Sequence, residues 1–471
     1  MIRFLHAYFP ARTLFLGISE ACLIALSFVA AAIFRLGTYD ATVMLHYEQG
    51  FLKIVALSGI LIVCMYYFDL YHTSVLSNQR EILSRLVQAL GTMCIGLTVL
   101  YYLYPPLELG RGIILVGLCI VLVILALWRV LFLALNQRPS FAERTVVFGD
   151  GPSAIGLSQE LDLRPELGIK VVGILSARSN GNYELSSRQH DPFSTTDTSI
   201  ISDLSSAIGR QRVSRIIVAM DDRRGKLPVD LLLAMKSRGV RIQDGAECYE
   251  QVTGKVPIEF LRLGTLLFSS GFHLSRFLVV YKRFASIVVS VFGLVVTLPL
   301  LPFIALAIKL SSPGNLLYHQ KRIGRDGAVF YCHKFRTMRA DAEADTGPTW
   351  ADDEDPRITT VGRLLRITRV DEIPQLWNVL KGDMSLVGPR PERPEFIEWL
   401  KQAIPFYDFR HTVRPGITGW AQIRYRYGNS VEDAKEKLRY DLFYIKNMSP
   451  GLDALILFET VKTILLGRGA R

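Results

Sequence analysis

The sequence predicts a membrane protein in three parts: four N-terminal transmembrane helices, a Rossmann-like α/β domain, and a mainly helical C-terminal domain. Three observations support this fold class. Half of the 471 residues are apolar and the formal net charge is +11, which is too apolar for an ordinary soluble protein of this length. Uncharged stretches of spanning length gather before residue 135. Strand-like and helix-like stretches then alternate.

The first part, residues 1–140, contains apolar segments that are long enough to cross a bilayer and carry almost no charge. Three charged residues lie toward segment ends, where Lys53 and Arg129 can snorkel to the interface and Glu20 can meet a partner. We expect no cleavable signal peptide, because the first segment is too long for the apolar core of one. The four predicted spans are residues 14–33, 51–68, 86–104 and 113–133.

The short loops between these segments predict the orientation. Arginines are more frequent before the first segment, between the second and third, and after the fourth than on the opposite side. Positive charge favours the cytoplasmic face, so the N-terminus and everything after about residue 135 should be cytoplasmic. None of the six cysteines has the spacing of a metal site, and we expect no disulfide framework.

The second part, residues 141–265, reads as an α/β domain with strands at 144–148, 169–174 and 213–219. It opens with VVFGDGPSAIG, in which three glycines lie at a strand-to-helix turn, the position of a dinucleotide fingerprint. The second strand, however, runs into Leu-Ser-Ala-Arg and lacks the acid that would bind ribose. We therefore expect a degenerate Rossmann-like scaffold that regulates the protein or mediates a homodimer. Residues 177–199 are predicted to form a surface loop.

The third part, residues 266–471, begins with an apolar run at about 284–308. Basic residues flank both ends of this run, which favours the same cytoplasmic face for both. Pro299 and Pro302 would interrupt a straight helix. The residues leave two readings open, a re-entrant helix that enters and leaves through one face, and a fifth complete crossing.

The adjacent carboxylates Asp371 and Glu372 are the densest chemical feature of the chain. They lie in LRITRVDEIPQLWNVLKGDMSLVGPRP, where Pro374 predicts a helix start and Asp371 its N-cap. Cations surround the pair, and arginine forks match phosphate oxygens while carboxylates bind Mg²⁺ beside phosphates. An ordinary helix cap within a solvated basic face is the alternative reading. The cations are Arg357, Arg363, Arg366, Arg369, Lys381 and Arg390.

Several motifs give the C-terminal part its resemblance to a known family. They are KRFASIVVSVFG, HKFRTM, DPRITTVGRLLR, the stretch around the acid pair, TVRPGITGWAQ and YDLFYIKN, in this order. Nearly the whole of this part resembles the bacterial sugar transferase family, the polyprenyl-phosphate phosphoglycosyl transferases. The complete chain resembles the large members of that family, and YEQVTGKVPIEFL resembles the exosortase-associated exopolysaccharide subgroup. The resemblance implies a monotopic catalytic domain and favours the re-entrant helix, although Thr297-Leu298-Pro299 stands where the family breaks that helix at Ser-Pro.

The resemblance also implies roles for individual residues. Asp371 would be the nucleophile and Glu372 a Mg²⁺ ligand, with Arg366 neutralising charge on the phosphates. Lys334, Arg336 and Arg390 would bind phosphate or uridine, and contact with lipid head groups is the alternative for these three. Asp383 and Asp441 would assist the metal or the acceptor, with capping or ion pairing as the alternative.

The function that the resemblance implies is transfer of a sugar 1-phosphate from a UDP-sugar to undecaprenyl phosphate, with release of UMP. This would be the first membrane step of exopolysaccharide or O-antigen synthesis, at the cytoplasmic face of a bacterial inner membrane. The partners would be the two substrates and membrane lipid, and no nucleic acid. The alternative is a membrane-anchored, NAD-dependent nucleotide-sugar dehydratase or epimerase, which would require an intact dinucleotide site.

Overall fold

A computed structural model of the chain describes most of its residues and divides them into two compact units, mainly Phe9–Gly245 and Ala246–Arg471. Two short strands near the N-terminus, β1 (Ile2–Phe4) and β2 (Ala7–Phe9), pair with each other. The described residues are 2–4, 7–71, 79–136, 142–177, 183–187, 212–221, 227–258, 270–272, 275–339, 342, 355–425, 428 and 430–466.

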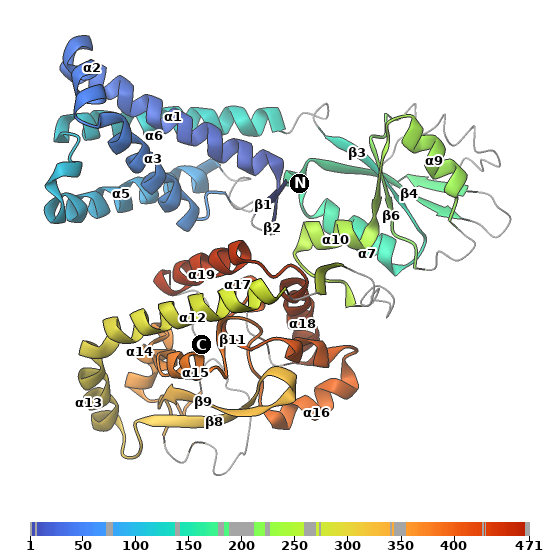
Figure 1. Cartoon of the computed structure of the whole chain (residues 1–471). Helices are drawn as coiled ribbons and strands as arrows, with labels where there is room; N and C mark the ends of the chain where they lie inside the picture. Colours follow the sequence, from blue (N-terminus) through green and yellow to red (C-terminus); the bar gives the residue numbers. More distant parts are fainter. Residues whose placement is uncertain are drawn as a thin grey trace. The chain divides into compact units, whose positions relative to one another are not determined.

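Apolar helices make up the N-terminal part of the first unit (Figure 1). They pack through a common apolar core to which every long helix contributes. Within the described residues, five helical stretches are long and apolar enough to cross a bilayer, four of them before residue 137. The chain is therefore a membrane protein. The helices are α1 (Ala11–Leu36), α2 (Thr38–Tyr47), α3 (Gly50–Tyr67), α5 (Gln79–Leu103) and α6 (Arg111–Asn136), with the 3-10 turn η1 (Pro105–Leu107) between the last two.

Arg129 of α6 differs from its prediction. Its guanidinium does not extend to the interface but is fully buried against Glu20 of α1, with Nε 2.7 Å from Oε1 and Nη2 3.0 Å from Oε2. Its Nη1 donates to the Leu70 carbonyl at 2.8 Å. A buried charge is costly unless it is paired, so the partner for Glu20 expected from the sequence is supplied by Arg129.

The α/β part contains a five-stranded sheet in the order β5-β4-β3-β6-β7. All neighbouring strands are parallel except β4 and β5, which confirms the predicted α/β class. Strand β5 lies inside the segment predicted to be a loop, whereas residues 188–199 of that segment are outside the described residues. The elements are β3 (Glu143–Phe148), α7 (Pro152–Asp162), η3 (Pro165–Leu167), β4 (Ile169–Ala177), β5 (Tyr183–Ser187), β6 (Arg215–Val218), α9 (Val229–Ser237) and β7 (Arg241–Asp244).

The second unit is mainly helical, as predicted, with two small two-stranded sheets, β8-β9 and β10-β11. Side-chain caps begin several of its helices: Ser275 accepts from Leu278 N, Thr359 from Gly362 N, and Ser449 from Leu452 N. Its elements are α10 (Gly245–Thr253), η5 (Ser270–Phe272), α12 (Arg276–Thr297), η6 (Leu298–Leu300), α13 (Leu301–Ser311), β8 (Leu317–Ile323), η7 (Arg325–Gly327), β9 (Val329–Phe335), α14 (Thr360–Ile367), η8 (Val370–Glu372), α15 (Gln375–Lys381), β10 (Ser385–Val387), α16 (Pro394–Ala403), η9 (Tyr407–Thr412), β11 (Gly416–Thr418), α17 (Trp420–Arg424), α18 (Val431–Lys446) and α19 (Pro450–Leu465).

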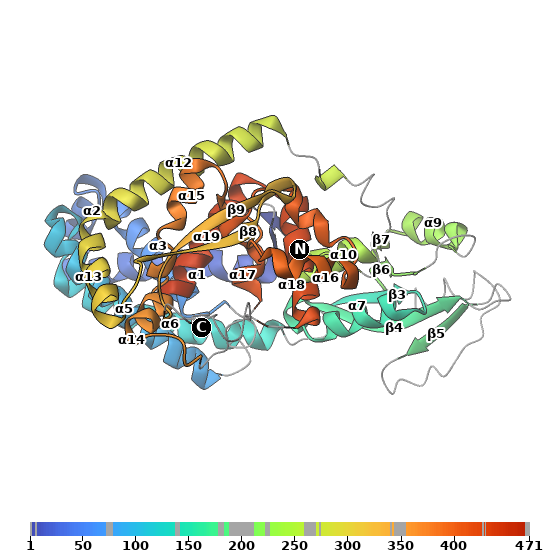
Figure 2. The same cartoon turned by 90° about the horizontal axis from the view of Figure 1, so that it is seen from below.

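The apolar run of the second unit is a bent helix pair. Helix α12 ends at Thr297, the 3-10 turn η6 contains Pro299, and α13 continues in a different direction, as Figures 1 and 2 both show. Proline lacks an N–H and clashes with the preceding turn, which accounts for a break at this position. Only 6% of the most apolar window of this pair is buried. The remaining apolar surface is therefore available for contact with lipid.

Candidate active site

The acid pair lies on a tight turn between two helices. After α14 ends, Arg369 adopts a left-handed backbone conformation with φ 58°, and the 3-10 turn η8 places Asp371 and Glu372 inside the unit. Both side chains are buried. The prediction that Asp371 caps the next helix is wrong, because Pro374 occupies the N-cap position of α15. The left-handed residue reverses the chain early enough for a separate turn to form before α15 begins.

Three cationic side chains surround the Glu372 carboxylate. Lys334 Nζ donates to its Oε1 at 2.8 Å, Arg390 Nη2 donates to the same oxygen at 3.0 Å, and Arg369 Nη1 lies 3.9 Å from it. Burial by itself would raise the pKa of Glu372, but the charges of Lys334, Arg390 and Arg369 outweigh it and hold that pKa well below its usual range. Glu372 is therefore ionised at neutral pH.

Asp371 has a different environment from its neighbour. Its Oδ2 lies 3.8 Å from Lys334 Nζ, while its Oδ1 is buried and has no hydrogen-bond partner among the described residues. Burial raises the pKa of Asp371, and the charge of Glu372 adds to this, while Lys334 and Arg366 oppose it. Two adjacent carboxylates thus differ in basicity, with the more basic one retaining an oxygen free to react.

The two cations predicted on β9 have separate surroundings. Lys334 contacts the acid pair as described above. Arg336 instead donates from Nη1 to the Pro313 carbonyl at 3.0 Å and from Nη2 to the Ser312 carbonyl at 2.6 Å. These contacts tie β9 to the turn that follows α13. Among the described residues, Arg336 forms its side-chain hydrogen bonds with this turn and not with the acid pair.

Arg366 on α14 acts electrostatically on the acid pair. Its Nε donates to Thr337 Oγ1 at 3.0 Å. Its positive charge lowers the pKa of Asp371. The arrangement agrees with the expectation that Arg366 neutralises charge near Asp371, and its role toward a substrate stays a prediction.

The loop that carries Arg390 is anchored on both sides of the residue. Before it, Gly388 N donates to Thr418 O and Gly416 N to Pro389 O, both at 2.9 Å. A side chain on Gly416 would collide with the Gly388 backbone, so this approach requires glycine. The β10-β11 pair therefore fixes the backbone from which Arg390 reaches Glu372.

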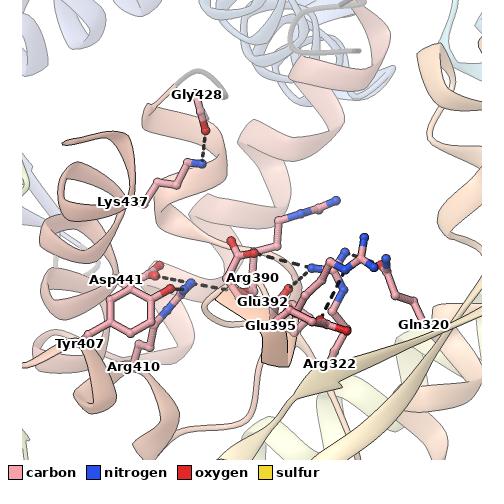
Figure 3. A network of polar contacts seen from close by, with 12 residues as sticks. Gln320, Arg322, Arg390, Glu392, Glu395, Tyr407, Arg410, Gly428, Lys437 and Asp441 are labelled. Atoms are coloured by element: carbon pink, nitrogen blue, oxygen red, sulfur yellow. Dashed lines mark hydrogen bonds and ion pairs between the residues drawn. The ribbon is translucent and has the colours of Figure 1, made fainter. Parts of the chain in front are cut away.

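Behind Arg390 lies a buried polar network (Figure 3). Arg410 Nη2 donates to the Arg390 carbonyl at 2.9 Å, and its Nη1 donates to the Tyr407 hydroxyl at 2.6 Å. The same guanidinium forms an ion pair with Asp441 of α18 at 2.9 Å. Asp441 is thus held behind the site rather than facing the acid pair. Arg322 supports the next residue of the loop by donating to the Pro391 carbonyl at 3.0 Å.

Asp383 lies just past the C-terminal end of α15. Its Oδ2 accepts from Asn378 Nδ2 at 3.4 Å and pairs with Lys381 at 3.3 Å. Asn378 is fully buried, donating also to the Tyr331 carbonyl at 2.7 Å and accepting from His333 N at 3.0 Å. These contacts correspond to the capping and ion-pairing alternative for Asp383, and its role toward a substrate is untested.

The sequence analysis did not identify Tyr407, Arg410 or Asn378. The contacts of Arg410 with the Arg390 carbonyl and of Asn378 with the backbone of β9 connect residues 20 to 47 positions apart, and no local pattern marks them. Within the motif YDLFYIKN, the sequence indicated Asp441 as a candidate residue but did not indicate its partner, Arg410.

The residues of this site fit Mg²⁺ only in combination with a phosphate ligand. Within the described residues no group of three or more metal-ligating side chains is present. Glu372 uses one oxygen, Oε1, for all its ion pairs with described residues, and Asp371 Oδ1 is unpartnered there. Mg²⁺ in proteins commonly takes one or two carboxylates and completes its shell with phosphates and water. Such a donor set is available here.

The glycine turn of the α/β part has an acidic side chain beside it. Asp221, three residues past β6, accepts a hydrogen bond from Ser153 in the first turn of α7. A side chain on Gly151 would overlap the Asp221 carboxylate. A carboxylate thus lies at the helix N-terminus, where a Rossmann domain binds pyrophosphate. Together with the missing ribose-binding acid, this disfavours the NAD-dependent alternative.

A bent apolar helix joined to a domain in which cations converge on two buried carboxylates defines a membrane protein with a densely charged buried site. The comparison with known proteins identifies the family. Residues 277–467 match the family model of the bacterial sugar transferases, and the chain belongs to this family.

Named relatives share large parts of the chain. A UDP-glucose:undecaprenyl-phosphate glucose-1-phosphate transferase of Klebsiella pneumoniae is 35% identical over 337 residues, which cover 69% of this chain and 68% of the relative. A UDP-N-acetylgalactosamine-undecaprenyl-phosphate N-acetylgalactosaminephosphotransferase of Aeromonas hydrophila is 44% identical over 225 residues, 47% of this chain and about half (52%) of that relative. An exopolysaccharide production protein of Rhizobium leguminosarum bv. phaseoli is 42% identical over 196 residues, 40% of this chain and 98% of its own length.

Proposed function

We propose that this protein transfers a sugar 1-phosphate from a UDP-sugar to undecaprenyl phosphate through a covalent intermediate on Asp371. The observation that carries the proposal is the asymmetry of the acid pair. Glu372 is ionised and engaged by three cations, whereas Asp371 is more basic and has one oxygen without a partner among the described residues. The names of the relatives supply the substrate classes.

The proposed reaction has two balanced steps. In the first, an Asp371 carboxylate oxygen attacks the sugar-linked phosphorus of the donor, a bond forms between them, and the bond from that phosphorus to the bridging oxygen breaks to release UMP. In the second, a phosphate oxygen of undecaprenyl phosphate attacks the same phosphorus. The acyl-phosphate bond breaks, the Asp371 carboxylate is regenerated, and a diphosphate-linked sugar leaves.

The residues of the site support these steps through charge and position. Lys334 and Arg390 would neutralise the diphosphate oxygens, and Arg366 would keep the Asp371 carboxylate ionised. Mg²⁺, bound by Glu372 together with the diphosphate, would supply further neutralisation. Both substrates would meet the site from the cytoplasmic side, with the acceptor's hydrocarbon in the leaflet entered by a re-entrant α12-α13 pair.

The experiment is to incubate the purified protein with Mg²⁺ and a panel of UDP-sugars, without acceptor, and to search by mass spectrometry for a phosphosugar adduct. We expect the adduct on the tryptic peptide that contains Asp371. The Asp371→Asn variant should form none, whereas the exposed Asp408→Asn control, in the same unit, should label as wild type. Full turnover by Asp371→Asn would refute the nucleophile assignment.

A further inference from the structure

A second positively charged pocket lies on one face of α12. It has a volume of about 520 Å³, part of which is open to solvent, and is lined by residues of α12, η7, β10, α18 and the segment after η9. Its cationic lining includes Arg283, Arg325 and Arg414, and its apolar lining includes Val279, Met384 and Val413. A pocket that combines apolar walls with convergent charges is the usual form of a ligand site.

The three arginines have few anionic partners in the described part of the chain. Arg283 donates to the Val379 and Leu380 carbonyls at 2.5 and 2.7 Å, which are neutral. Arg325 pairs with its exposed neighbour Asp326 at 3.2 Å. Arg414 has no ion pair or hydrogen bond with a described residue. Positive charge in this pocket is therefore largely uncompensated, which favours an anionic ligand.

The three guanidinium groups line the same pocket and act on one another electrostatically. The pKa of Arg414 is lowered, first by burial and then by the charges of Arg283 and Arg325. Like charges this close repel, and a phosphate between them would remove the repulsion while accepting charge-assisted hydrogen bonds from several donors.

The pocket is separate from the acid pair. Glu372 precedes α15, whereas Arg283 binds the carbonyls at the opposite end of that helix. Seven residues of helix span about 10 Å. A phosphate held by Arg283 would therefore lie far outside the roughly 3–3.5 Å that an attack on phosphorus requires, so the pocket does not hold the reacting phosphate of either substrate.

Helix α12 also carries an exposed apolar face, on the side away from its pocket-lining residues Val279, Arg283 and Ser286. Phe277, Val280 and Phe284 are 77%, 67% and 68% exposed, and the helix belongs to the stretch of spanning length with almost no burial. A ligand that satisfies both the arginines and the apolar walls of the pocket has a phosphate and a hydrocarbon part. We propose that the pocket binds the head group of an anionic phospholipid, with its phosphate among Arg283, Arg325 and Arg414 and the start of its acyl chains against Val279, Met384 and Val413.

The test uses the full-length protein in detergent, delipidated and then supplied with short-chain phosphatidylglycerol or phosphatidylcholine, with bound lipid counted by native mass spectrometry. We expect one phosphatidylglycerol to be retained. Arg414→Gln and Arg325→Gln should each weaken retention at least about tenfold, since each removes a charge-assisted contact. Arg276→Gln, an exposed arginine of α12 outside the pocket lining, should not.

Circular dichroism verifies the fold of each variant. Because two arginine variants are tested independently, the proposal can still be tested if one of them misfolds. Equal retention of phosphatidylcholine would overturn the proposal, as would displacement of the lipid by equimolar inorganic phosphate. Binding of undecaprenyl phosphate without binding of phosphatidylglycerol would reassign the pocket to the acceptor. Retention is measured without a sugar donor, so its outcome is independent of the transfer reaction.

Discussion

Asp441 illustrates how a buried residue can affect the site without reaching it. It pairs with Arg410, whose guanidinium in turn holds the carbonyl of Arg390. Burial raises the pKa of Asp441 to about 6, against the opposing charge of Arg410. Between about pH 4 and pH 6, Asp441 therefore keeps its proton in the folded state, whereas in the unfolded chain the same carboxyl has already lost it.

This raised pKa predicts the sign of a pH effect. The stability of wild type relative to Asp441→Asn should fall as pH rises from about 4 to 6, by at most on the order of 3 kcal/mol, and stay constant above that window. Thermal unfolding of both proteins in detergent at a series of pH values measures the difference. Loss of the ion pair with Arg410 adds a constant to the difference in stability between the two proteins. The pH dependence of that difference is therefore the quantity to compare.

The control for this effect is Asp408→Asn. Asp408 is exposed and paired with Lys401 at 2.9 Å, and its pKa is lowered because the hydrogen bond and charge of Lys401 outweigh its partial burial. The corresponding difference for Asp408 should not fall over the same window. A difference for Asp441 that rises between pH 4 and 6 would contradict the assignment.

At the scale of elements, Asn378 joins α15 to β9. Asn378→Leu removes the acceptor for His333 N and the donor to the Tyr331 carbonyl, leaving two part-buried backbone groups unpaired. Each unpaired group costs about 1–3 kcal/mol, so we expect a loss of about 2–5 kcal/mol in chemical unfolding. Lys381→Gln on the exposed face of α15 should change stability by less than about 0.5 kcal/mol. Wild-type stability of Asn378→Leu would show that these contacts are dispensable.

The bent α12-α13 pair gives a topological prediction. Native Cys332 is buried and therefore unsuitable as a probe. The two ends can instead be probed in a cysteine-free background with single cysteines introduced at Arg276 and Asn315, both of which are exposed. If the pair is re-entrant, a membrane-impermeant thiol reagent should label both positions in inside-out vesicles and neither in intact cells. Labelling at opposite faces would establish a complete crossing instead.

The elements divide by how much of them could be predicted. The α/β strands and the break in the apolar run follow from local patterns, because β-rich runs and prolines act on their own neighbourhood. The buried contact of Arg129 with Glu20 could not be predicted with confidence, because snorkelling and pairing are equally open to an arginine near a segment end. Likewise, the acid pair is visible in the sequence, but its 3-10 turn depends on a left-handed residue, Arg369, whose type does not require that conformation.

For the whole molecule, the two-unit division predicts a separable C-terminal unit. The segment from Ala246 packs on that unit through Glu250 with Lys446 at 2.8 Å, the Gly254 carbonyl with Trp420 Nε1 at 2.9 Å, and Val256 N with the Arg439 carbonyl at 3.0 Å. A fragment of residues 246–471 should therefore form the phosphosugar adduct in the assay described above. Removal of residues 246–258 should lower its melting temperature, because it leaves Lys446 and the Trp420 indole without these partners.

The test compares both fragments with the intact chain by adduct formation and thermal unfolding. A folded fragment of residues 246–471 that forms no adduct would mean that the N-terminal unit contributes to the chemistry. Equal melting temperatures for the two fragments would mean that the 246–258 segment is only a linker.

The unpartnered oxygen of Asp371 links activity to the resting stability of the protein. A buried polar atom without a partner raises the free energy of the folded state, and ligands that bind only the folded state and satisfy that atom recover the difference. Nucleotide-sugar should therefore raise the melting temperature of wild type. Asp371→Asn, which removes the desolvated charge of that carboxylate, should melt above wild type in the absence of substrate and gain less from it. The residue proposed to carry the chemistry would then be a local weakness of the fold, a trade-off between durability and reactivity.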